Sequence, residues 1–268
     1  MLNRILIAAG LLVIAGVAIL FRTYVLPVLI IVFGLICYYE TYKAFQNIGI
    51  SPNLWTGCAM ILGMIPMYYA LGEEGILILY MILTMMDLIW PIFYPNRKYP
   101  DVVASVFLMF YPTFGFIALT MINAIEPAVL GTLGIAMATL IPSMSDIGAL
   151  FIGKTFGRHK LAPDISPKKT IEGAVGGMIC SILTGLLIGV IALTTNYFAG
   201  LALWEYLIIG FVCGMAAQIG DLTASALKRY TGVKDFGTVF MSHGGVMDRM
   251  DSILMGAVAV ICLLKLMK

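Results

Sequence analysis

A succession of apolar segments, each about as long as a bilayer is thick, is the feature that most constrains this chain. A helix needs roughly 20 apolar residues to cross the hydrocarbon core, and such segments recur along most of the 268 residues. Charged residues make up 11% of the chain, against roughly 25% of a soluble domain. No alternation typical of strands competes, so we predict an all-α, polytopic integral membrane protein with about nine transmembrane helices. The predicted spans are residues 4–21, 25–40, 54–71, 75–94, 102–122, 128–150, 174–195, 203–226 and 252–267.

Lysine and arginine are placed asymmetrically about these spans. With the N-terminus inside, nine spans put thirteen of the sixteen basic residues on the cytoplasmic side, and only Arg22, Lys265 and Lys268 fall outside. Cytoplasmic loops carry the excess of lysine and arginine in membrane proteins. We therefore predict a protein of the cytoplasmic (inner) membrane whose charged loops face the cytoplasm. The opening span, residues 4–21, is longer than the apolar core of a signal peptide and is interpreted as a retained helix.

The few charges gather in two stretches. Residues 146–172 hold eight of them and residues 221–251 hold another eight, out of thirty in the chain. Charge at a membrane boundary is costly and is usually functional. We therefore divide the chain by function into an N-terminal lipid-embedded part, residues 1–130, and a C-terminal catalytic part, residues 131–268. The net charge of +2 is too small to indicate nucleic-acid binding.

The later stretch combines residues that bind phosphate with residues that bind hard cations. Asp221, Ser225 and Lys228 are spaced i, i+4 and i+7, so they share one face of the eighth span. Asp248 and Asp251 are three residues apart and share a face where the ninth span begins. Carboxylates are ligands that Mg²⁺ prefers, so we interpret the three aspartates as a divalent-metal site. Two plainer interpretations stay open: a hydrogen bond between helices for Asp221, and capping of a helix start for the other two.

The segment between these aspartates adds two glycines and a histidine. Gly244 and Gly245 carry no side chain, so the backbone there can approach a ligand closely. His243 is interpreted as a hydrogen-bond donor. The only other histidine is His159, and no cysteine is spaced to complete a zinc site.

The earlier stretch contains a candidate anion site. Ser166 and Pro167 have the character of the cap and first residue of a helix, which would place the amides near Lys168 and Lys169 at a helix N-terminus. Such a terminus binds anions. Asp146, near the cytoplasmic end of the sixth span, adds a carboxylate. The alternative is that the lysines only orient the protein and bind lipid headgroups.

Two other features are interpreted as structural. Gly148-x-x-x-x-Gly153-Lys154-Thr155 fits the Walker A pattern literally. A P-loop requires a strand before it and a helix after it, whereas here an apolar membrane helix continues. Asp87, inside the fourth span, is interpreted as a contact between helices.

Two patterns of fixed spacing run through the charged stretches. The later pattern is Ser225-x-Leu227-Lys228-Arg229, Lys234-Asp235-x-Gly237 and His243-Gly244-Gly245-Val246-x-Asp248-Arg249-Met250-Asp251. The earlier pattern is Lys160-Leu161-x-Pro163-x-Ile165-Ser166-Pro167-x-Lys169-Thr170-x-Glu172-Gly173. Both resemble the phosphatidate cytidylyltransferases, also called CDP-diacylglycerol synthases. Met241 departs from the family pattern, which usually has proline, glycine or serine there.

The resemblance implies a reaction. CMP would pass from CTP to phosphatidate, giving CDP-diacylglycerol and pyrophosphate in phospholipid synthesis, at an active site that faces the cytoplasm. A phosphomonoester is mostly dianionic at about pH 7, so this nucleophile needs no general base. Mg²⁺, as one ion or two, together with lysine and arginine donors, would offset the repulsion between two anionic substrates.

The candidate site residues follow from these roles. The predicted metal ligands are Asp146, Asp221, Asp248 and Asp251. The predicted catalytic residues are Lys169, Lys228, Arg229, Asp248 and Arg249. The predicted substrate contacts are Lys168, Ser225, Lys234, His243, Gly244 and Gly245. The expected partners are CTP, phosphatidate and membrane lipid, and a homodimer is one option for the assembly.

Two other classes of protein stay open. A secondary transporter of an anionic solute would usually show repeat symmetry and broken helices in both halves, whereas this chain concentrates its charge in one half. Another membrane CDP-lipid enzyme, a CDP-alcohol phosphotransferase, would carry a DG-x-x-AR signature. That signature is absent, and the sequence Asp248-Arg249-Met250-Asp251 lacks the glycine that would follow.

Overall fold

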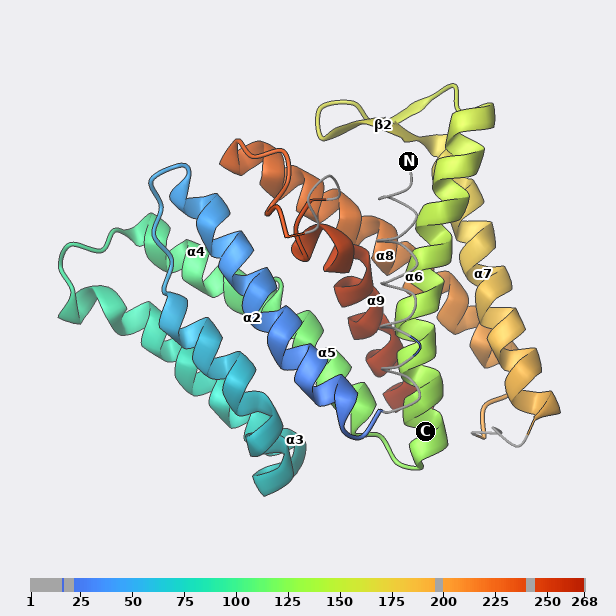
Figure 1. Cartoon of the computed structure of the whole chain (residues 1–268), viewed down its shortest axis with the longest axis horizontal. Helices are drawn as coiled ribbons and strands as arrows, with labels where there is room; N and C mark the ends of the chain where they lie inside the picture. Colours follow the sequence, from blue (N-terminus) through green and yellow to red (C-terminus); the bar gives the residue numbers. More distant parts are fainter. Residues whose placement is uncertain (1–15, 17–21, 196–199, 240–243, 268) are drawn as a thin grey trace. The chain divides into compact units, whose positions relative to one another are not determined.

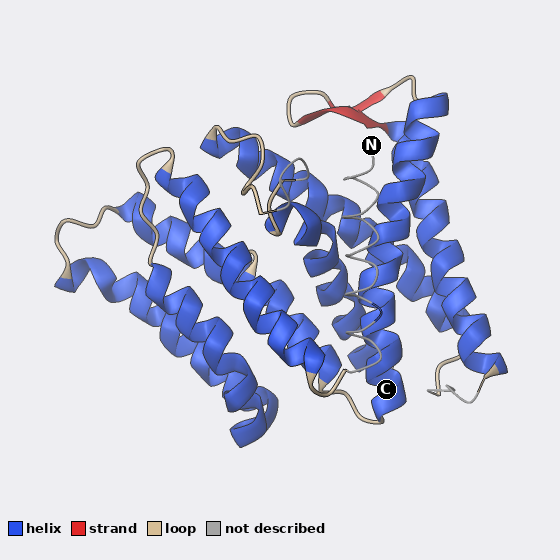
Figure 2. Cartoon of the chain, in the orientation of Figure 1, coloured by secondary structure: helices blue, strands red, loops and turns tan. Residues whose placement is uncertain are grey.

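The structure is a computed structural model of the chain, and it describes residues 16, 22–195, 200–239 and 244–267. Helices make up most of this part, and the only strands within it form one short hairpin (Figures 1 and 2). The nearly all-helical fold class is therefore confirmed. In chain order the elements are α2 (Val25–Gln46), α3 (Leu54–Phe93), α4 (Tyr99–Phe110), α5 (Thr113–Asn123), α6 (Ala128–Phe156), β1 (Lys160–Ala162), β2 (Ser166–Thr170), α7 (Ile171–Thr194), α8 (Leu203–Thr231) and α9 (Met247–Leu266).

Six helical segments in the described part of the chain are long and apolar enough to cross a membrane, so the predicted count of nine is not confirmed. The first predicted span, residues 4–21, lies outside the described residues apart from Gly16. Two predicted spans fall within α3, which counts once. Helix α9 is not among the six, because it carries Asp248, Arg249 and Asp251 near its start and Lys265 in its last turn.

Helix α3 turns back on itself at Gly72. The φ of Gly72 is 66° and its ψ is −149°, a non-helical conformation that glycine adopts readily. Along a straight helix, Thr56 and Asp87 would be roughly 46 Å apart at about 1.5 Å per residue, yet Thr56 Oγ1 donates a hydrogen bond to Asp87 Oδ1 over 2.8 Å. The two arms of α3 therefore match the predicted spans 54–71 and 75–94. The predicted contact of Asp87 between helices is confirmed.

The predicted span at residues 102–122 is divided into α4 and α5 by Tyr111 and Pro112. A residue that precedes proline is disfavoured in the helical region, and Tyr111 is extended, with φ −137° and ψ 112°. The apolar run continues across this break, so composition alone did not show it. Together α4 and α5 count as one candidate span, Tyr99–Asn123.

The chain forms two compact units. Unit 1 comprises the described residues within 1–121 and 228–250, and unit 2 comprises those within 122–227 and 251–268. Helices α8 and α9 each contribute residues to both units. The predicted division at residue 130 was functional rather than structural and stays a prediction.

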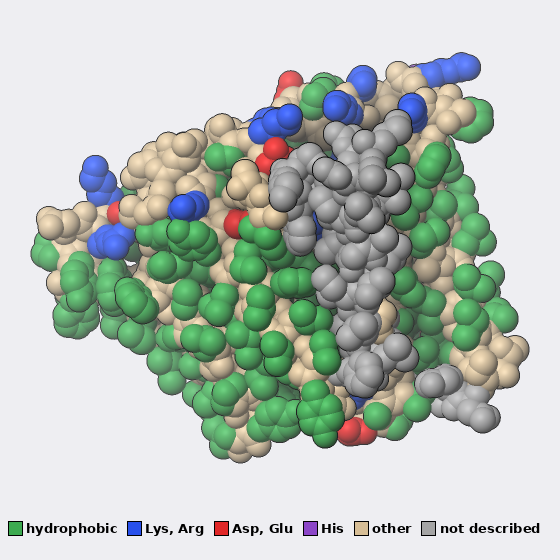
Figure 3. Space-filling view, in the orientation of Figure 1, with side chains coloured by type: hydrophobic (Ala, Val, Ile, Leu, Met, Phe, Trp, Pro, Cys, Tyr) green, Lys and Arg blue, Asp and Glu red, His purple; other side chains and the backbone are tan. Residues whose placement is uncertain are grey.

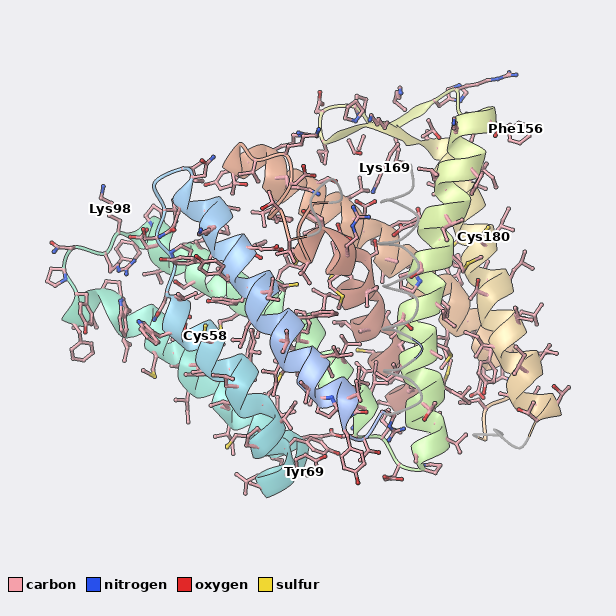
Figure 4. All side chains as sticks on the ribbon, viewed as in Figure 1. Cys58, Tyr69, Lys98, Phe156, Lys169 and Cys180 are labelled. Carbon is pink, nitrogen blue, oxygen red and sulfur yellow. The ribbon has the colours of Figure 1, made fainter. Side chains whose placement is uncertain are left out.

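Small residues let the helices pack closely inside each unit. In unit 1, a Cβ on Gly57 of α3 would lie 1.9 Å from the ring of the buried Tyr38 on α2. In unit 2, a Cβ on Gly148 of α6 would lie 2.4 Å from Sγ of Cys180 on α7 (Figure 4). Close approach through small residues is the usual way in which helices associate in lipid.

The outer surfaces of the helices are strongly apolar. Hydrophobic side chains cover the visible flanks of the helices, whereas lysine and arginine gather toward helix ends and loops (Figure 3). Large exposed side chains include Trp55 and Ile92 in unit 1, and Val175 and Leu187 in unit 2. Apolar exposure on this scale is unusual for a soluble monomer. It is expected of an integral membrane protein whose helices face lipid.

The segment before α7 is a β-hairpin, and the predicted helix start at Ser166 and Pro167 is wrong. Strands β1 and β2 are antiparallel, with Lys160 opposite Thr170. Helix α7 instead begins after Thr170, whose Oγ1 accepts a hydrogen bond from the amide of Gly173 over 3.1 Å. Ser166-Pro167 and Thr170 both have the character of a helix start. Because Ser166 and Pro167 are part of strand β2, Thr170 is the residue that caps α7.

Candidate active site

The predicted phosphate-binding residue Lys169 forms an ion pair with the predicted metal ligand Asp221. Lys169 lies near the end of β2 in unit 2 (Figure 4), and its Nζ is 2.6 Å from Asp221 Oδ2 on α8. The side chains are 24% and 30% exposed, so the pair is accessible to a ligand. Gln218, one turn earlier on α8, donates to the carbonyl of Ala174 on α7 over 2.9 Å. This bond fixes α8 against the start of α7, where β2 delivers Lys169.

The other two predicted metal ligands of unit 2, Asp146 and Asp251, meet at Ser252. The hydroxyl of Ser252 on α9 donates to Oδ2 of Asp146 on α6 over 3.1 Å. The backbone amide of Ser252 donates to Oδ1 of Asp251 over 2.7 Å. A Cβ on Gly220 would lie 2.6 Å from the carbonyl oxygen of Asp251, so α8 and α9 are in close contact beside Asp221. Three helices thus bring three of the four predicted metal ligands into one unit.

The donor chemistry of this group fits Mg²⁺, but the group is not a preformed metal cage. Among the described residues, no three histidine, cysteine, aspartate or glutamate side chains are gathered closely enough to hold a metal ion. A cationic group, the ammonium of Lys169, already stands against Asp221. Mg²⁺ is usually bound by one or two protein carboxylates together with substrate phosphates. The carboxylates therefore suit an ion that arrives with a phosphate-bearing ligand.

In unit 1, the end of α8 is fixed so that Lys228 lies in its last turn. Gly232 has a φ of 70°, which ends the helix in the left-handed conformation. The amide of Val233 then donates back to the carbonyl of Lys228 over 3.0 Å. Asn47, after α2, donates to the carbonyl of Thr231 over 2.9 Å. These contacts hold the end of α8 against the end of α2.

Asp248, the fourth predicted metal ligand, is held by three donors in unit 1. Its Oδ1 accepts from Nζ of Lys228 over 2.8 Å, and its Oδ2 accepts from the amides of Phe236 and Gly245, each over 2.9 Å. The side chains of Lys228 and Asp248 are 15% and 5% exposed. In this arrangement Asp248 organises the loop that carries the family pattern. Its role as a metal ligand stays a prediction.

The remaining predicted residues lie in various surroundings. Ser225 is half-buried on α8, one turn after Asp221, as the spacing predicted. Gly244 and Gly245 are buried, and the groups that lie closest to them are carboxylates of the protein itself. His243 lies outside the described residues, as does Met241. The predicted basic residues that are exposed are Lys168, Arg229, Lys234 and Arg249.

Two residues of these clusters were missed by the sequence analysis. Glu40 on α2 accepts hydrogen bonds from the amides of Val246 and Met247. Its only signal was a lone acid at the end of an apolar span. Ser252 was visible only as the neighbour of Asp251. The Walker A interpretation was rejected correctly, because residues 148–155 all lie inside α6 and no strand enters them.

The fold and the clusters define a class: a polytopic helical membrane protein with lysine–carboxylate pairs suited to phosphate chemistry. A model of the cytidylyltransferase family matches residues 2–267, and the chain belongs to this family. It is 44% identical over 120 residues to the phosphatidate cytidylyltransferase of Staphylococcus saprophyticus, an alignment that covers 45% of this chain and 44% of the relative. The identity is 44% over 121 residues for the Staphylococcus epidermidis enzyme and 41% over 122 residues for that of Staphylococcus aureus. The chain thus spans less than half the length of the curated relatives it matches.

Proposed function

We propose that the protein is a phosphatidate cytidylyltransferase, which converts CTP and phosphatidate to CDP-diacylglycerol and pyrophosphate. The observation that carries the proposal is the Lys169–Asp221 ion pair, because it joins the earlier pattern that resembles this family to the helix α8, in which the later pattern begins. The names of the relatives support the same reaction. The apolar flanks of the helices suit an enzyme whose substrate and product both carry two acyl chains.

The role proposed for these residues is to offset the negative charge of the substrate phosphates and of the leaving pyrophosphate. An oxygen of the phosphatidate phosphate attacks the α-phosphorus of CTP, the bond from that phosphorus to the bridging oxygen breaks, and pyrophosphate leaves. Lys169 exchanges Asp221 for a substrate phosphate, and this releases the Asp221 carboxylate. Mg²⁺, when bound, would neutralise charge on the phosphates of CTP and on the leaving pyrophosphate. The residues that would hold it are Asp146, Asp221 and Asp251, with Asp248 as the fourth predicted ligand.

Product analysis tests the proposed reaction directly. Purified protein in mixed micelles, given CTP labelled at the α-phosphate, is expected to form labelled CDP-diacylglycerol only when phosphatidate and Mg²⁺ are both present. A CDP-alcohol phosphotransferase would consume CDP-diacylglycerol and would not form it. A transporter would form no labelled lipid at all. Either result would overturn the proposal.

A homodimeric assembly stays a prediction.

Substitutions of Lys169 test whether it binds phosphate or only anchors the protein to anionic lipid. Arginine keeps the charge but replaces a compact ammonium by a broad planar fork, which is not equivalent in a fixed pocket. We expect Lys169→Arg to lower kcat by about tenfold or more, and Lys169→Ala to be at least as severe, with unchanged membrane content. Lys160→Arg is the matched control, because Lys160 lies in the same hairpin and donates to the carbonyl of Pro167. Wild-type rates for both Lys169 variants would leave only the anchoring role.

The proposed cytoplasmic orientation of the charged loops is tested by cysteine labelling. In a background without the five native cysteines, Thr238→Cys and Glu74→Cys each introduce one exposed thiol. Thr231, the last residue of α8, is unsuitable because it is fully buried. A membrane-impermeant maleimide added to intact cells is expected to label Glu74→Cys, and to label Thr238→Cys only after permeabilisation. The reverse pattern would overturn the orientation.

A further inference from the structure

We propose that Glu40 is a positioning residue for the active site. In this role it holds the turn that enters α9 so that Asp248 and Lys228 keep the orientation that the reaction requires. Glu40 lies on α2, in the part of the chain that the charge distribution assigned to lipid rather than to catalysis. The inference rests on the proposed function and adds a residue to it.

Glu40 acts as a helix cap supplied from a distant segment. Its Oε1 accepts from the amide of Val246 over 3.1 Å, and its Oε2 accepts from the amide of Met247 over 2.8 Å. Helix α9 begins at Met247, and the first amides of a helix have no partner within the helix. A carboxylate there is also favoured by the helix dipole. Glu40 is only 5% exposed, so water cannot readily replace it.

Two glycines of the family pattern make room for this carboxylate. A Cβ on Gly237 would lie 2.1 Å from Oε1 of Glu40, and a Cβ on Gly245 would lie 2.3 Å from the same atom. Neither glycine has a positive φ. What these positions require is therefore space and not backbone freedom. Gly245, which was expected to admit a ligand, instead borders the side chain of Glu40.

The turn held by Glu40 is also the turn that holds Asp248. The amide of Gly245 donates to Asp248, and the next two amides in the chain donate to Glu40. Three successive amides are thus shared between two carboxylates. Asp248 in turn carries the ion pair to Lys228. Release of Glu40 would therefore move Asp248 and Lys228 without removing either of them.

Removal of the Glu40 carboxylate is expected to lower kcat with little change in the KM for CTP. A misplacement of about 1 Å can cost roughly 100-fold in rate, so we expect a loss of about 10- to 100-fold for Glu40→Ala. Glu40→Gln keeps one acceptor oxygen and is expected to lose less. Asp101→Asn is the matched control, because Asp101 also accepts from two backbone amides of unit 1, those of Ser51 and Lys98. A wild-type kcat for Glu40→Ala, or an equal fall for Asp101→Asn, would overturn the proposal.

Gly245 provides a test of the coupling. Gly245→Ala alone would place a methyl group against Glu40, whereas in the double variant with Glu40→Ala that space is free. We expect the effects on kcat and on thermal stability to be non-additive, so that the double variant is no worse than Gly245→Ala alone. Additive effects would show that the two residues act separately and would overturn the proposal.

Hydrogen exchange separates the failure of this inference from the failure of the proposed function. In Glu40→Ala, the amides of Val246 and Met247 are expected to exchange faster, whereas the amides of α6 are unchanged. This measurement needs no turnover. A wild-type protein that forms no CDP-diacylglycerol would refute the proposed function, and unchanged exchange at Val246 and Met247 would refute the role of Glu40.

Discussion

Asp221→Asn is expected to abolish CTP-dependent turnover, with a fall in kcat of about 100- to 1,000-fold, while the protein still inserts into the membrane. Asparagine has nearly the same volume but carries no charge, so it can neither balance Lys169 nor bind Mg²⁺ well. Loss of one preorganised charge contact commonly costs this much in kcat. The measurement is the initial rate of CDP-diacylglycerol formation in mixed micelles, across a titration of Mg²⁺.

Two further variants define what such a loss would mean. Asp164→Asn is the control, because Asp164 is an exposed acid in the loop of the hairpin that carries Lys169. This variant is expected to keep wild-type rates. The double variant Asp221→Asn with Lys169→Gln restores charge balance without a carboxylate. If the double variant regained activity, the ion pair would be only structural. Near-normal activity of Asp221→Asn at limiting Mg²⁺ would show that Asp221 is not a ligand.

The helices could be placed from the sequence because an apolar run of bilayer length is a local signal. For the same reason the two apolar runs that flank Gly72 were predicted as separate spans, and the turn lies between them. The break at Tyr111 and Pro112 was missed, because the apolar run continues on both sides of it. The hairpin was missed because its strands have three and five residues, too few for alternation to be recognised.

The site could be predicted only where its geometry is local. Asp221, Ser225 and Lys228 share a face of α8 because helix periodicity requires it. The pairing of Lys169 with Asp221 depends instead on how β2 packs beside α8. The contact of Glu40 with Met247 joins residues 207 positions apart. Neither contact has a signal in residue spacing, and both are products of tertiary packing.

Asp248→Asn is expected to lower both stability and turnover. Asparagine offers one acceptor oxygen where Asp248 now receives Lys228 and the amides of Phe236 and Gly245. The two charged side chains are largely buried, and removal of one partner of a buried ion pair costs about 3–5 kcal/mol. We expect kcat to fall by about 100-fold or more, and thermal unfolding in detergent to begin at a lower temperature.

Asp248 has two candidate roles, as a ligand of Mg²⁺ and as an organiser of the loop. The two roles predict different results for a double variant that also removes the charge of Lys228. If Asp248 acts only by balancing Lys228, the double variant Asp248→Asn with Lys228→Gln will recover thermal stability, because no buried charge is left without its partner. It will remain inactive if either side chain contacts substrate or metal. Lys228→Gln alone separates these cases, because it keeps the carboxylate. Recovery of both stability and turnover in the double variant would remove Asp248 and Lys228 from the catalytic machinery and leave them as a structural pair.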